Sequence, residues 1–292
     1  MKRIIYTVAT GPNKYSEMAM GLARSLNLLG DKTPRVVVTD NKNYDWSRYF
    51  DQVVEPKDDG TGSIYFAKLT ALERTDADQV IFIDSDCLAF KSLDPVFDLC
   101  EGSGLAATGT KATTGVWYTK TVADVCRDFK LDWLPVINTG VLFYERTSEG
   151  EKLITEARSF ISEYQAMGFE LLRGNPSDEP CISMAMATTG LGKVLPLELN
   201  LNESGVGLIG KLEMDVIAGR CKFLSGNPHL RRVEPIVFHA HYFSKFRIYW
   251  RELKRLEDLE RYLDSHKPRF MSRGTRIRRT IEKRYLKMIG KI

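Results

Sequence analysis

Two aspartates separated by one residue, Asp84 and Asp86, follow the short apolar run that begins at Gln79. The run predicts a buried strand of a parallel sheet, which delivers both side chains to the carboxyl edge of that sheet. Side chains two residues apart in an extended chain share a face, so both carboxylates can point the same way. Carboxylates held together repel each other, and a divalent cation such as Mn²⁺ or Mg²⁺ removes that conflict. The alternative is a polar strand end, in which the aspartates cap the following turn.

Two histidines, His239 and His241, are also two residues apart, in a segment that predicts a strand. Both imidazoles can therefore share one face. Imidazole is the commonest nitrogen ligand of transition cations, and a set of two aspartates and one histidine suits Mn²⁺ better than Mg²⁺. We expect one of the two histidines to be a metal ligand. The alternative is a hydrogen-bonded histidine of the protein core.

Two adjacent acids, Asp178 and Glu179, stand at the start of a predicted helix. In a catalytic interpretation, one carboxylate stabilises positive charge at a reacting carbon or accepts a proton as a general base. In the alternative interpretation, the carboxylates cap the free backbone N–H groups of the helix.

Alternating strand-like and helix-like segments must position these residues. Strands are predicted for RIIYTVAT, RVVVTD, QVVEP and QVIFIDSD, and helices for the segment from Tyr15 to Leu29 and for IYFAKLTALERT. This alternation predicts a parallel sheet flanked by helices, with Thr10, Asp40 and Asp84 at its carboxyl edge. The loops GTKATTGVWYT and LLRGNPSDEPC are long enough to be binding loops.

The composition is that of an ordinary globular protein, with 43% hydrophobic and 27% charged residues among 292. No run approaches the roughly 20 apolar residues that a membrane-spanning helix needs, and the first residues predict a strand rather than a signal sequence. We therefore expect a cytoplasmic protein, or one bound to the inner face of a membrane. The five cysteines form no C-x-x-C pair, so neither a disulfide framework nor a structural zinc site is predicted.

The carboxyl-terminal segment differs from the rest of the chain in charge. Residues 267–292 contain ten Lys or Arg and one acid, so they carry +9 and the preceding residues −5 of the net charge of +4. Apolar residues recur in this segment at helical spacing, namely Ile277, Ile281, Tyr285, Met288 and Ile289. The pattern predicts a basic amphipathic helix that suits an anionic membrane surface. No nucleic-acid partner is expected, because no recognition motif accompanies the basic residues. We expect a catalytic domain at residues 1–250 and a helical, basic extension at 251–292.

The segment VIFIDSDCLAF resembles the D-x-D strand of GT-A glycosyltransferases. The resemblance is greatest to the retaining family 8 type, which includes glycogenin and bacterial lipopolysaccharide galactosyltransferases and glucosyltransferases. Further segments occur in the order of that family over residues 3–250. The resemblance implies the GT-A fold, a Rossmann-like mixed sheet flanked by helices. It also implies that Asp84, Asp86 and one histidine hold the metal, and that Ser85 contacts the donor.

Residues that would contact the donor nucleotide and diphosphate are carried over segment by segment. The opening VATGPNKYSEM resembles the nucleotide-binding loop of the family, which makes Thr10, Asn13 and Tyr15 the matching positions. IYFAKL resembles the helix that carries a basic residue toward the donor, and Lys68 stands where Arg is commoner. The family has a Lys-Pro-Trp motif at the diphosphate, and Lys245 matches its Lys, although the Pro is missing here.

Residues that would meet the donor sugar lie in three further segments. INTGVLFYE resembles the N-x-G-V strand of the family and carries over Asn138 and Gly140. SDEPCISMA resembles a D-Q segment near the anomeric carbon, with Asp178 at the Asp and Glu179 where Gln is usual. LPLELNLN is similar to the L-P-x-x-x-N segment and brings in Asn200.

The resemblance implies a metal-dependent hexosyltransferase. Such an enzyme moves a hexose from a nucleotide diphosphate sugar, here expected to be a UDP-sugar, to a glycan or lipid-linked acceptor with retention of anomeric configuration. A haloacid-dehalogenase-type phosphatase is the alternative enzyme, because it also has D-x-D after an apolar strand. That family has Thr or Val where this chain has Leu88. A noncatalytic relative that binds nucleotide sugars is the other alternative.

Overall fold

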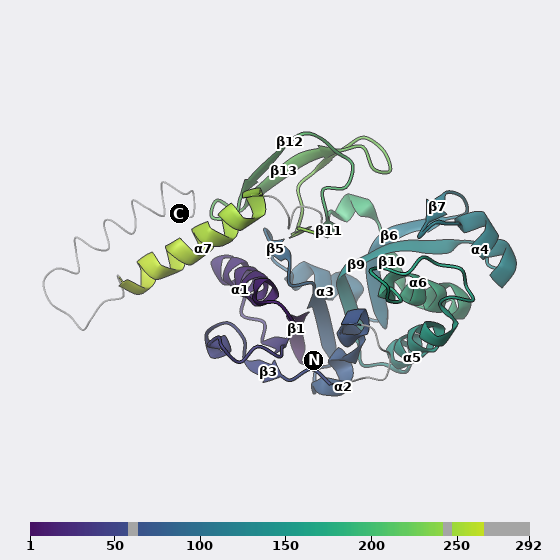
Figure 1. The fold of residues 1–292 in the computed structure, drawn as a ribbon, viewed down its shortest axis with the longest axis horizontal. Coiled ribbons are helices and arrows are strands. Elements are labelled where there is room, and N and C mark those ends of the chain that lie inside the picture. Colours follow the sequence, from purple (N-terminus) through teal and green to yellow (C-terminus); the bar gives the residue numbers. More distant parts are fainter. Residues whose placement is uncertain (58–63, 242–246, 266–292) are drawn as a thin grey trace, which may run out of the picture.

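The computed structural model describes residues 1–57, 64–241 and 247–265, which form a mixed α/β fold (Figure 1). At its centre is a seven-stranded sheet with the strand order β10 (Lys193–Leu195), β6 (Leu105–Ala112), β9 (Leu134–Glu145), β4 (Gln79–Ile83), β1 (Arg3–Val8), β2 (Arg35–Val38) and β3 (Gln52–Val54). β9 runs antiparallel to its neighbours β4 and β6, and the other neighbouring strands are parallel. The Rossmann-like mixed sheet that the resemblance implies is confirmed, and the strands from β1 to β4 are parallel as their alternation with helices predicts.

The strand β4 shows why the sheet is covered on both faces. Val80 and Phe82 belong to the apolar core on one face, whereas Ile81 and Ile83 belong to the core on the other. All four side chains are buried, which explains the continuous apolar run in the sequence. The apolar run therefore specifies a central strand. Packing on both faces of the sheet fixes the carboxyl end of this strand.

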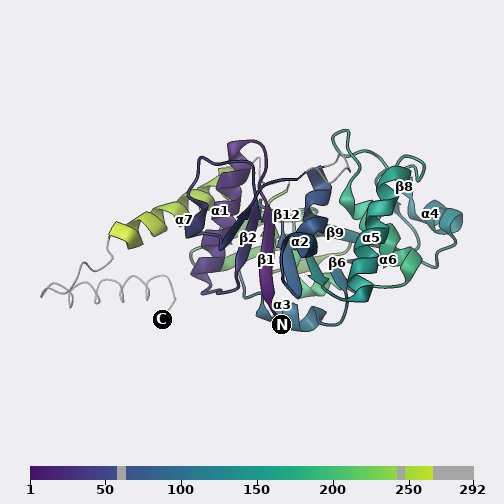
Figure 2. The same ribbon diagram turned by 90° about the horizontal axis from the view of Figure 1, so that it is seen from below.

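Helices contribute side chains to the apolar cores on both faces of the sheet. The first core includes α5 (Ser148–Glu163) and α6 (Asp178–Thr189), which lie side by side next to β9 and β6 in Figure 2. The second core includes α1 (Asn13–Leu28) and α3 (Asp94–Cys100). The predicted helix IYFAKLTALERT is a 3₁₀ helix, η2 (Ile64–Thr70), followed by the short α2 (Ala71–Arg74). The shorter 3₁₀ turns are common as connectors between elements.

A small sheet beside the main one brings distant parts of the chain to the end of β4. It consists of β11 (Asn202–Glu203), β15 (Val237–His239) and β5 (Cys87–Ala89). β15 pairs antiparallel with β5, with His239 opposite Cys87. The strand predicted for EPIVFHAHYF is therefore shorter than its apolar pattern indicates, and His241 lies beyond its end.

Two further groups of strands and three short helices lie outside the two sheets described above. One group is the three-stranded sheet of β12 (Leu208–Asp215), β13 (Arg220–Ser225) and β14 (Arg231–Val233). The other is the hairpin of β7 (Val116–Trp117) and β8 (Lys120–Thr121), which precedes α4 (Val122–Phe129). The remaining 3₁₀ helices are η1 (Trp46–Arg48) and η3 (Leu197–Leu199).

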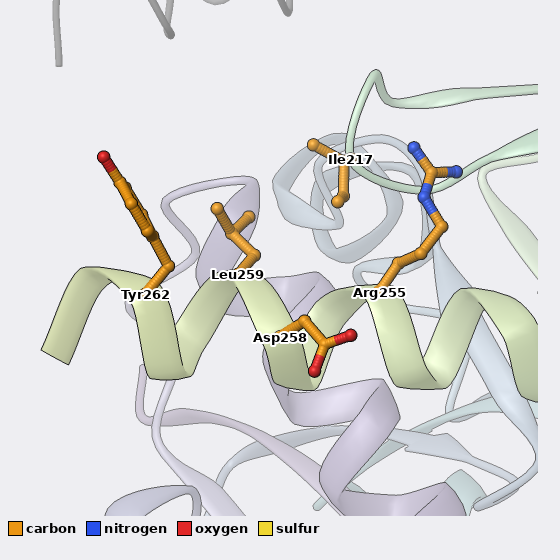
Figure 3. A pocket seen from close by; sticks show the side chains of 5 residues that line it. All are labelled: Ile217, Arg255, Asp258, Leu259 and Tyr262. Carbon is orange, nitrogen blue, oxygen red and sulfur yellow. The ribbon is translucent and has the colours of Figure 1, made fainter. Parts of the chain in front are cut away.

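The last described helix, α7 (Arg247–Ser265), packs against α1 and against the sheet of β12 and β13 (Figure 1). Its Leu253 and Leu256 share a core with Met18 of α1. Figure 3 shows Arg255 and Leu259 projecting from α7 toward the turn that carries Ile217, and they help to line a groove of about 390 Å³. The predicted division at residue 250 falls inside this helix and stays a prediction.

Within the described ranges, no helix is both long and apolar enough to cross a membrane. The predicted basic helix falls in residues 266–292, which lie outside the described residues.

A buried carboxylate, Glu252, fastens α7 to the turn after β12. Its side chain is 0% exposed and accepts hydrogen bonds from the Val216 N–H at 3.0 Å and from Nη1 of Arg255 at 2.8 Å. Removing one partner of a buried charge pair leaves the other charge uncompensated, which is costly. Glu257, on the same helix, pairs with Lys254 and Arg261 at the surface instead.

We predict that Glu252→Ala lowers the free energy of unfolding by about 2 kcal/mol, because the Val216 N–H loses its acceptor and the Arg255 guanidinium keeps Asp215 but loses Glu252. The matched variant Glu257→Ala should change it by no more than about 0.5 kcal/mol, since it removes only surface ion pairs. Urea denaturation measures both. Equal losses in the two variants would show that Glu252 does not anchor α7.

Candidate functional site

A cleft of about 480 Å³ lies at the carboxyl ends of β1 and β4. This is the edge at which open α/β sheets bind ligands. The cleft collects most of the residues that the sequence singles out, namely Thr10, Tyr15, Lys68, Asp84, Ser85, Asp86, Asn138, Asp178, Glu179, His239 and His241. Three predicted residues, Asn13, Gly140 and Asn200, are not among those that line it. Lys245 lies outside the described residues.

Asp84, Asp86 and His239 converge on one point of the cleft. Nε2 of His239 lies 3.3 Å from Oδ1 of Asp86 and 3.6 Å from Oδ2 of Asp84. The pairing of β15 with β5 causes this approach, because it places His239 opposite Cys87, the residue that follows Asp86. The exposed His241 lies beside it, with 5.6 Å between the two ring centroids. His239 is therefore the histidine that approaches both aspartates.

The charges of these three groups depend on one another. Burial raises the pKa of Asp84. Burial acts in the same direction on Asp86, but the charge and hydrogen bond of His239 outweigh it and lower the pKa of Asp86. Burial alone would lower the pKa of His239, yet Asp86 and then Asp84 raise it. The site therefore favours positive charge at the point where the three side chains meet.

The donor set fits a divalent cation. The imidazole nitrogen of His239 lies within 3.6 Å of both carboxylates, and these ligand types suit Mn²⁺. The Sγ atom of Cys87 is also near, within 4.8 Å of ligand atoms of Asp86 and His239. Burial, with the charges of Asp86 and Asp84, raises the pKa of Cys87 well above its ordinary value. A thiol that keeps its proton is a poor metal ligand, so Asp84, Asp86 and His239 stay the predicted ligands.

Gly140 packs directly against the imidazole of His239. A Cβ atom at position 140 would lie 2.3 Å from Nδ1 and 2.6 Å from Cε1 of His239, so only glycine leaves room for the imidazole. The O atom of Gly140 accepts the backbone N–H of Asp84 at 2.8 Å. Gly140 thus touches both the histidine and one aspartate of the cluster, although the sequence resemblance assigned it to the donor sugar.

A bulge in β9 brings Asn138 to the cleft and Gly140 against His239. In the pairing with β6, Ala107 is opposite Leu142 and the next residue, Thr108, is opposite Asn138. The residues of β9 between Asn138 and Leu142 therefore have no partner on β6. Bulges of this kind redirect side chains beside binding sites. Oδ1 of Asn138 accepts hydrogen bonds from the Gly140 N–H at 2.9 Å and from Nδ2 of Asn202 at 2.6 Å.

The asparagine that reaches Asn138 is Asn202 rather than Asn200, which the sequence resemblance brought in. Oδ1 of Asn200 accepts a hydrogen bond from Nη1 of Arg231 at 2.9 Å instead. Asn200 also has a left-handed backbone, with φ at 51°. The segment LPLELNLN contains both asparagines, and only the pairing of β11 with β15 turns Asn202 toward the site.

Lys68 lies below the cleft between two aspartates. Its Nζ atom is 3.0 Å from Oδ2 of Asp178 and 3.5 Å from Oδ1 of Asp84, and the residue is 6% exposed. Burial alone would lower the pKa of Lys68, but Asp178 and then Asp84 raise it, so the ammonium group stays charged. The buried charge offsets part of the repulsion among the carboxylates that surround it.

Asp178 and Glu179 begin α6, yet their side chains contact other elements. Asp178 pairs with Lys68, and Glu179 accepts hydrogen bonds from the Thr139 N–H at 3.2 Å and from the Tyr118 hydroxyl at 2.8 Å. Burial, followed by the charge of Asp178, raises the pKa of Glu179 to about 7. A carboxyl group with this pKa can hold or release a proton at neutral pH.

The opposite end of the cleft is formed by the first loop and α1. Thr10 and Tyr15 line it together with Lys14, whose Nζ lies 4.9 Å from the centroid of the Tyr15 ring. Asp40 accepts the backbone N–H of Gly11 at 2.9 Å and so fixes this loop. Oδ1 of Asn13 accepts a hydrogen bond from the Asn41 side chain at 2.9 Å.

Several residues of the cleft were not singled out from the sequence. They are Lys14, Tyr65, Tyr118, Thr139, Arg173 and Ser204, among others. Tyr118 and Arg173 lie in the two loops that the sequence analysis marked as long enough to bind a ligand. The length of these loops was the available signal, but it does not indicate which of their residues turns inward.

No protein-family profile and no curated protein sequence matches this chain. Among solved structures, the glycosyltransferase GlyE of Streptococcus pneumoniae TIGR4 is similar, with 16% identity, a TM-score of 0.47, and coverage of 70% of this chain and 48% of that one. The galactosyltransferase LgtC, solved with donor and acceptor sugar analogues, has 16% identity, a TM-score of 0.49, and coverage of 68% and 75%. Mouse xyloside xylosyltransferase 1 has 12% identity, a TM-score of 0.48, and coverage of 70% and 88%.

All three similar structures are glycosyltransferases, the class that the sequence motifs resemble. This chain spans about half of the length of GlyE, at 48%.

We predict that Gly140→Ala weakens Mn²⁺ binding by about 10- to 100-fold, the range typical of disturbed support for a metal ligand. The reason is that the added methyl group forces the imidazole of His239 away from the aspartates. Calorimetric titration of Mn²⁺ measures the affinity.

The control is Gly30→Ala, where an added Cβ meets nothing within 4 Å although φ is 77°. It carries the backbone strain of a glycine replacement without touching the cluster, so its Mn²⁺ affinity should equal that of the wild type. Wild-type affinity in Gly140→Ala would mean that His239 is not a ligand.

Proposed function

We propose that this protein is a metal-dependent glycosyltransferase, which moves a hexose from a UDP-sugar to a glycan or lipid-linked acceptor with retention of configuration. The observation that carries the proposal is the convergence of Asp84, Asp86 and His239 in a cleft at the carboxyl edge of the sheet. Such a cluster suits a cation bound to a diphosphate. The same cleft contains Asp178 and Glu179, which are suited to charge and proton chemistry.

In this proposal Asp84, Asp86 and His239 hold Mn²⁺ or Mg²⁺ on the donor diphosphate. The bound cation would offset the negative charge that develops on the diphosphate as it leaves. Ser85 lies between the two aspartates and lines the cleft, which supports its predicted contact with the donor. Lys245, outside the described residues, remains the predicted second cation near the phosphates.

The nucleotide would occupy the end of the cleft formed by Thr10 and Tyr15. The half-buried Tyr15 ring, which lines the cleft, and the nearby Lys14 suit a planar base and its charged phosphates. Asn13 stays a predicted base contact, and its Oδ1 accepts a hydrogen bond from the side chain of Asn41.

The donor sugar would lie over Asn138, Asp178 and Glu179. Asn138 is held by Gly140 and Asn202 and presents its amide group to the cleft. Asp178, paired with Lys68, stays close to the reacting carbon and would stabilise positive charge there. Glu179, with its pKa raised to about 7, would accept the proton that the acceptor hydroxyl loses.

The acceptor and the location of the protein belong to the same proposal. The basic composition of residues 267–292 supports attachment to an anionic membrane surface on its inner, cytoplasmic face. Such attachment would bring the cleft close to a glycolipid acceptor.

We predict that the protein slowly hydrolyses a UDP-sugar when Mn²⁺ is present and no acceptor is added. EDTA should abolish this reaction, and Asp86→Asn should slow it by about 100-fold, because the cation loses a charged ligand. The measurement is release of nucleoside diphosphate from a panel of UDP-, GDP- and CDP-sugars. Asp132→Asn, at an exposed aspartate outside the cleft, serves as the matched control.

Two outcomes would contradict the proposal. Hydrolysis of phosphate monoesters with no reaction of any nucleotide sugar would identify a phosphatase that uses the same aspartates. Metal-dependent binding of a UDP-sugar without turnover, even with a range of glycan acceptors, would identify a noncatalytic relative.

A further inference from the structure

The hairpin of β7 and β8 turns through two residues with unusual backbone angles. Tyr118 has φ at 48° and Thr119 has φ at 63°, both in the left-handed region. Two-residue hairpin turns with positive φ at both positions normally use Asn and Gly. For a bulky aromatic residue and a β-branched one, this conformation costs on the order of 1–3 kcal/mol each. The turn is therefore maintained by contacts of its side chains and backbone with the rest of the protein.

Contacts with the segment before α6 hold the hairpin in place. The O atom of Tyr118 accepts the Glu170 N–H at 3.2 Å, and Lys120 donates to the O atom of Met167 at 2.6 Å. The Trp117 ring packs edge-on against Phe169, with 6.2 Å between centroids. Val116, in contrast, is 70% exposed, so the hairpin is a surface element from which Tyr118 turns inward.

The hydroxyl of Tyr118 links two residues at the start of α6. It donates to Oε2 of Glu179 at 2.8 Å and lies 2.8 Å from Oγ of the buried Ser177. Because a hydroxyl has a single proton, Tyr118 can donate to Glu179 while it accepts from Ser177. Burial and the charge of Glu179 raise the pKa of Tyr118, so the phenol keeps its proton and remains a donor.

We propose that Tyr118 is a positioning residue, which fixes the carboxyl group of Glu179 toward the cleft and stabilises its ionised form. Positioning of Glu179 at a sugar rests on the proposed function, whereas the effect on its ionisation does not. The strained turn is explained by this role, since a residue with an easier backbone conformation at 118, such as Asn or Gly, would not reach Glu179. Thr139, which donates its N–H to Oε1 of Glu179, holds the other carboxyl oxygen.

Four charged or titratable groups act on Glu179 from the surrounding elements. Asp178 on the same helix raises its pKa, and Lys68 of η2 and the Tyr118 hydrogen bond lower it. Tyr164, at the end of α5, is also close enough to interact with Glu179 electrostatically. Among these, Tyr118 is the group whose hydrogen bond can be removed by one isosteric change without altering a formal charge.

The sign of the pH dependence follows from the raised pKa. Glu179 keeps its proton in the folded protein up to about pH 7 but loses it near its ordinary value of 4.5 when unfolded. Its contribution to stability is therefore fully present below pH 4.5 and is lost as the pH rises to about 7. Loss of the Tyr118 hydrogen bond, which favours the charged form, should shift the upper end of this window to higher pH.

We predict that Tyr118→Phe raises the pH at which this loss ends by about one unit, because a hydrogen bond to a charged group has been removed. The experiment measures the free energy of unfolding in urea from pH 4.5 to 9 for wild type, Tyr118→Phe, Glu179→Gln and the double variant. In the Glu179→Gln background, Tyr118→Phe should cause a loss of stability that does not vary with pH. When the effect of Tyr118→Phe in the wild type is compared with its effect in the Glu179→Gln background, the titration of all other groups cancels.

Tyr164→Phe is the matched control, because it also removes a buried tyrosine hydroxyl, one that donates to the O atom of Glu170 at 2.8 Å. Its effect should be the same throughout pH 4.5 to 9, because the pKa of Tyr164 is raised to about 12, so the phenol is uncharged in this range, and its hydroxyl does not donate to Glu179. If Tyr118→Phe also gives a constant loss in both backgrounds, Tyr118 is a structural residue only and the proposal is overturned.

Activity gives a separate readout once a UDP-sugar is known to react. The midpoint of the pH–rate profile should rise by about one unit in Tyr118→Phe, in parallel with the stability data. A stability shift without any turnover would leave the role of Tyr118 intact and overturn the proposed function. Turnover with an unchanged pH profile would overturn the role of Tyr118.

Discussion

The concentration of carboxyl groups at one strand end is the constraint on which the rest of the site depends. Asp84, Asp86, Asp178 and Glu179 all line one cleft, and like charges so close together cannot all be ionised without a compensating charge. The protein itself supplies part of this compensating charge, since the buried ammonium group of Lys68 lies between Asp84 and Asp178. A cation beside Asp84 and Asp86 would supply the rest, while the raised pKa of Glu179 keeps the fourth carboxyl group partly protonated.

This constraint explains features of the fold that otherwise look unrelated. In the small sheet, the pairing of β15 with β5 places His239 against Asp86. Position 140 is a glycine because the imidazole of His239 occupies the space that a Cβ atom would need. The bulge in β9 turns Asn138 into the cleft beside the same cluster. The strained turn at Tyr118 brings a hydroxyl to Glu179 from a hairpin that otherwise lies at the surface.

Local patterns in the sequence predict the sheet and its strand end, whereas contacts between distant segments decide the details of the site. The apolar run before Asp84 specifies a central strand because both faces of β4 are buried, and this reasoning needs no other part of the chain. The choice between His239 and His241 depends on the register of β15 against β5, some 150 positions away in the chain, which no local pattern encodes. Tyr118 was missed for the same reason, since its partners Ser177 and Glu179 lie 59 and 61 residues further on. The helix with Lys68 was predicted, but its burial between two aspartates depends on α6.

The most direct test of the central claim is a calorimetric titration of UDP into the protein. It should be done with Mn²⁺, with EDTA, and with Mn²⁺ in a variant that combines Asp84→Ala and Asp86→Ala. We predict binding that requires both the metal and the two aspartates, because the cation would link them to the diphosphate. Binding of equal strength in EDTA or in the double variant, or no binding of UDP, GDP or CDP under any of these conditions, would contradict it.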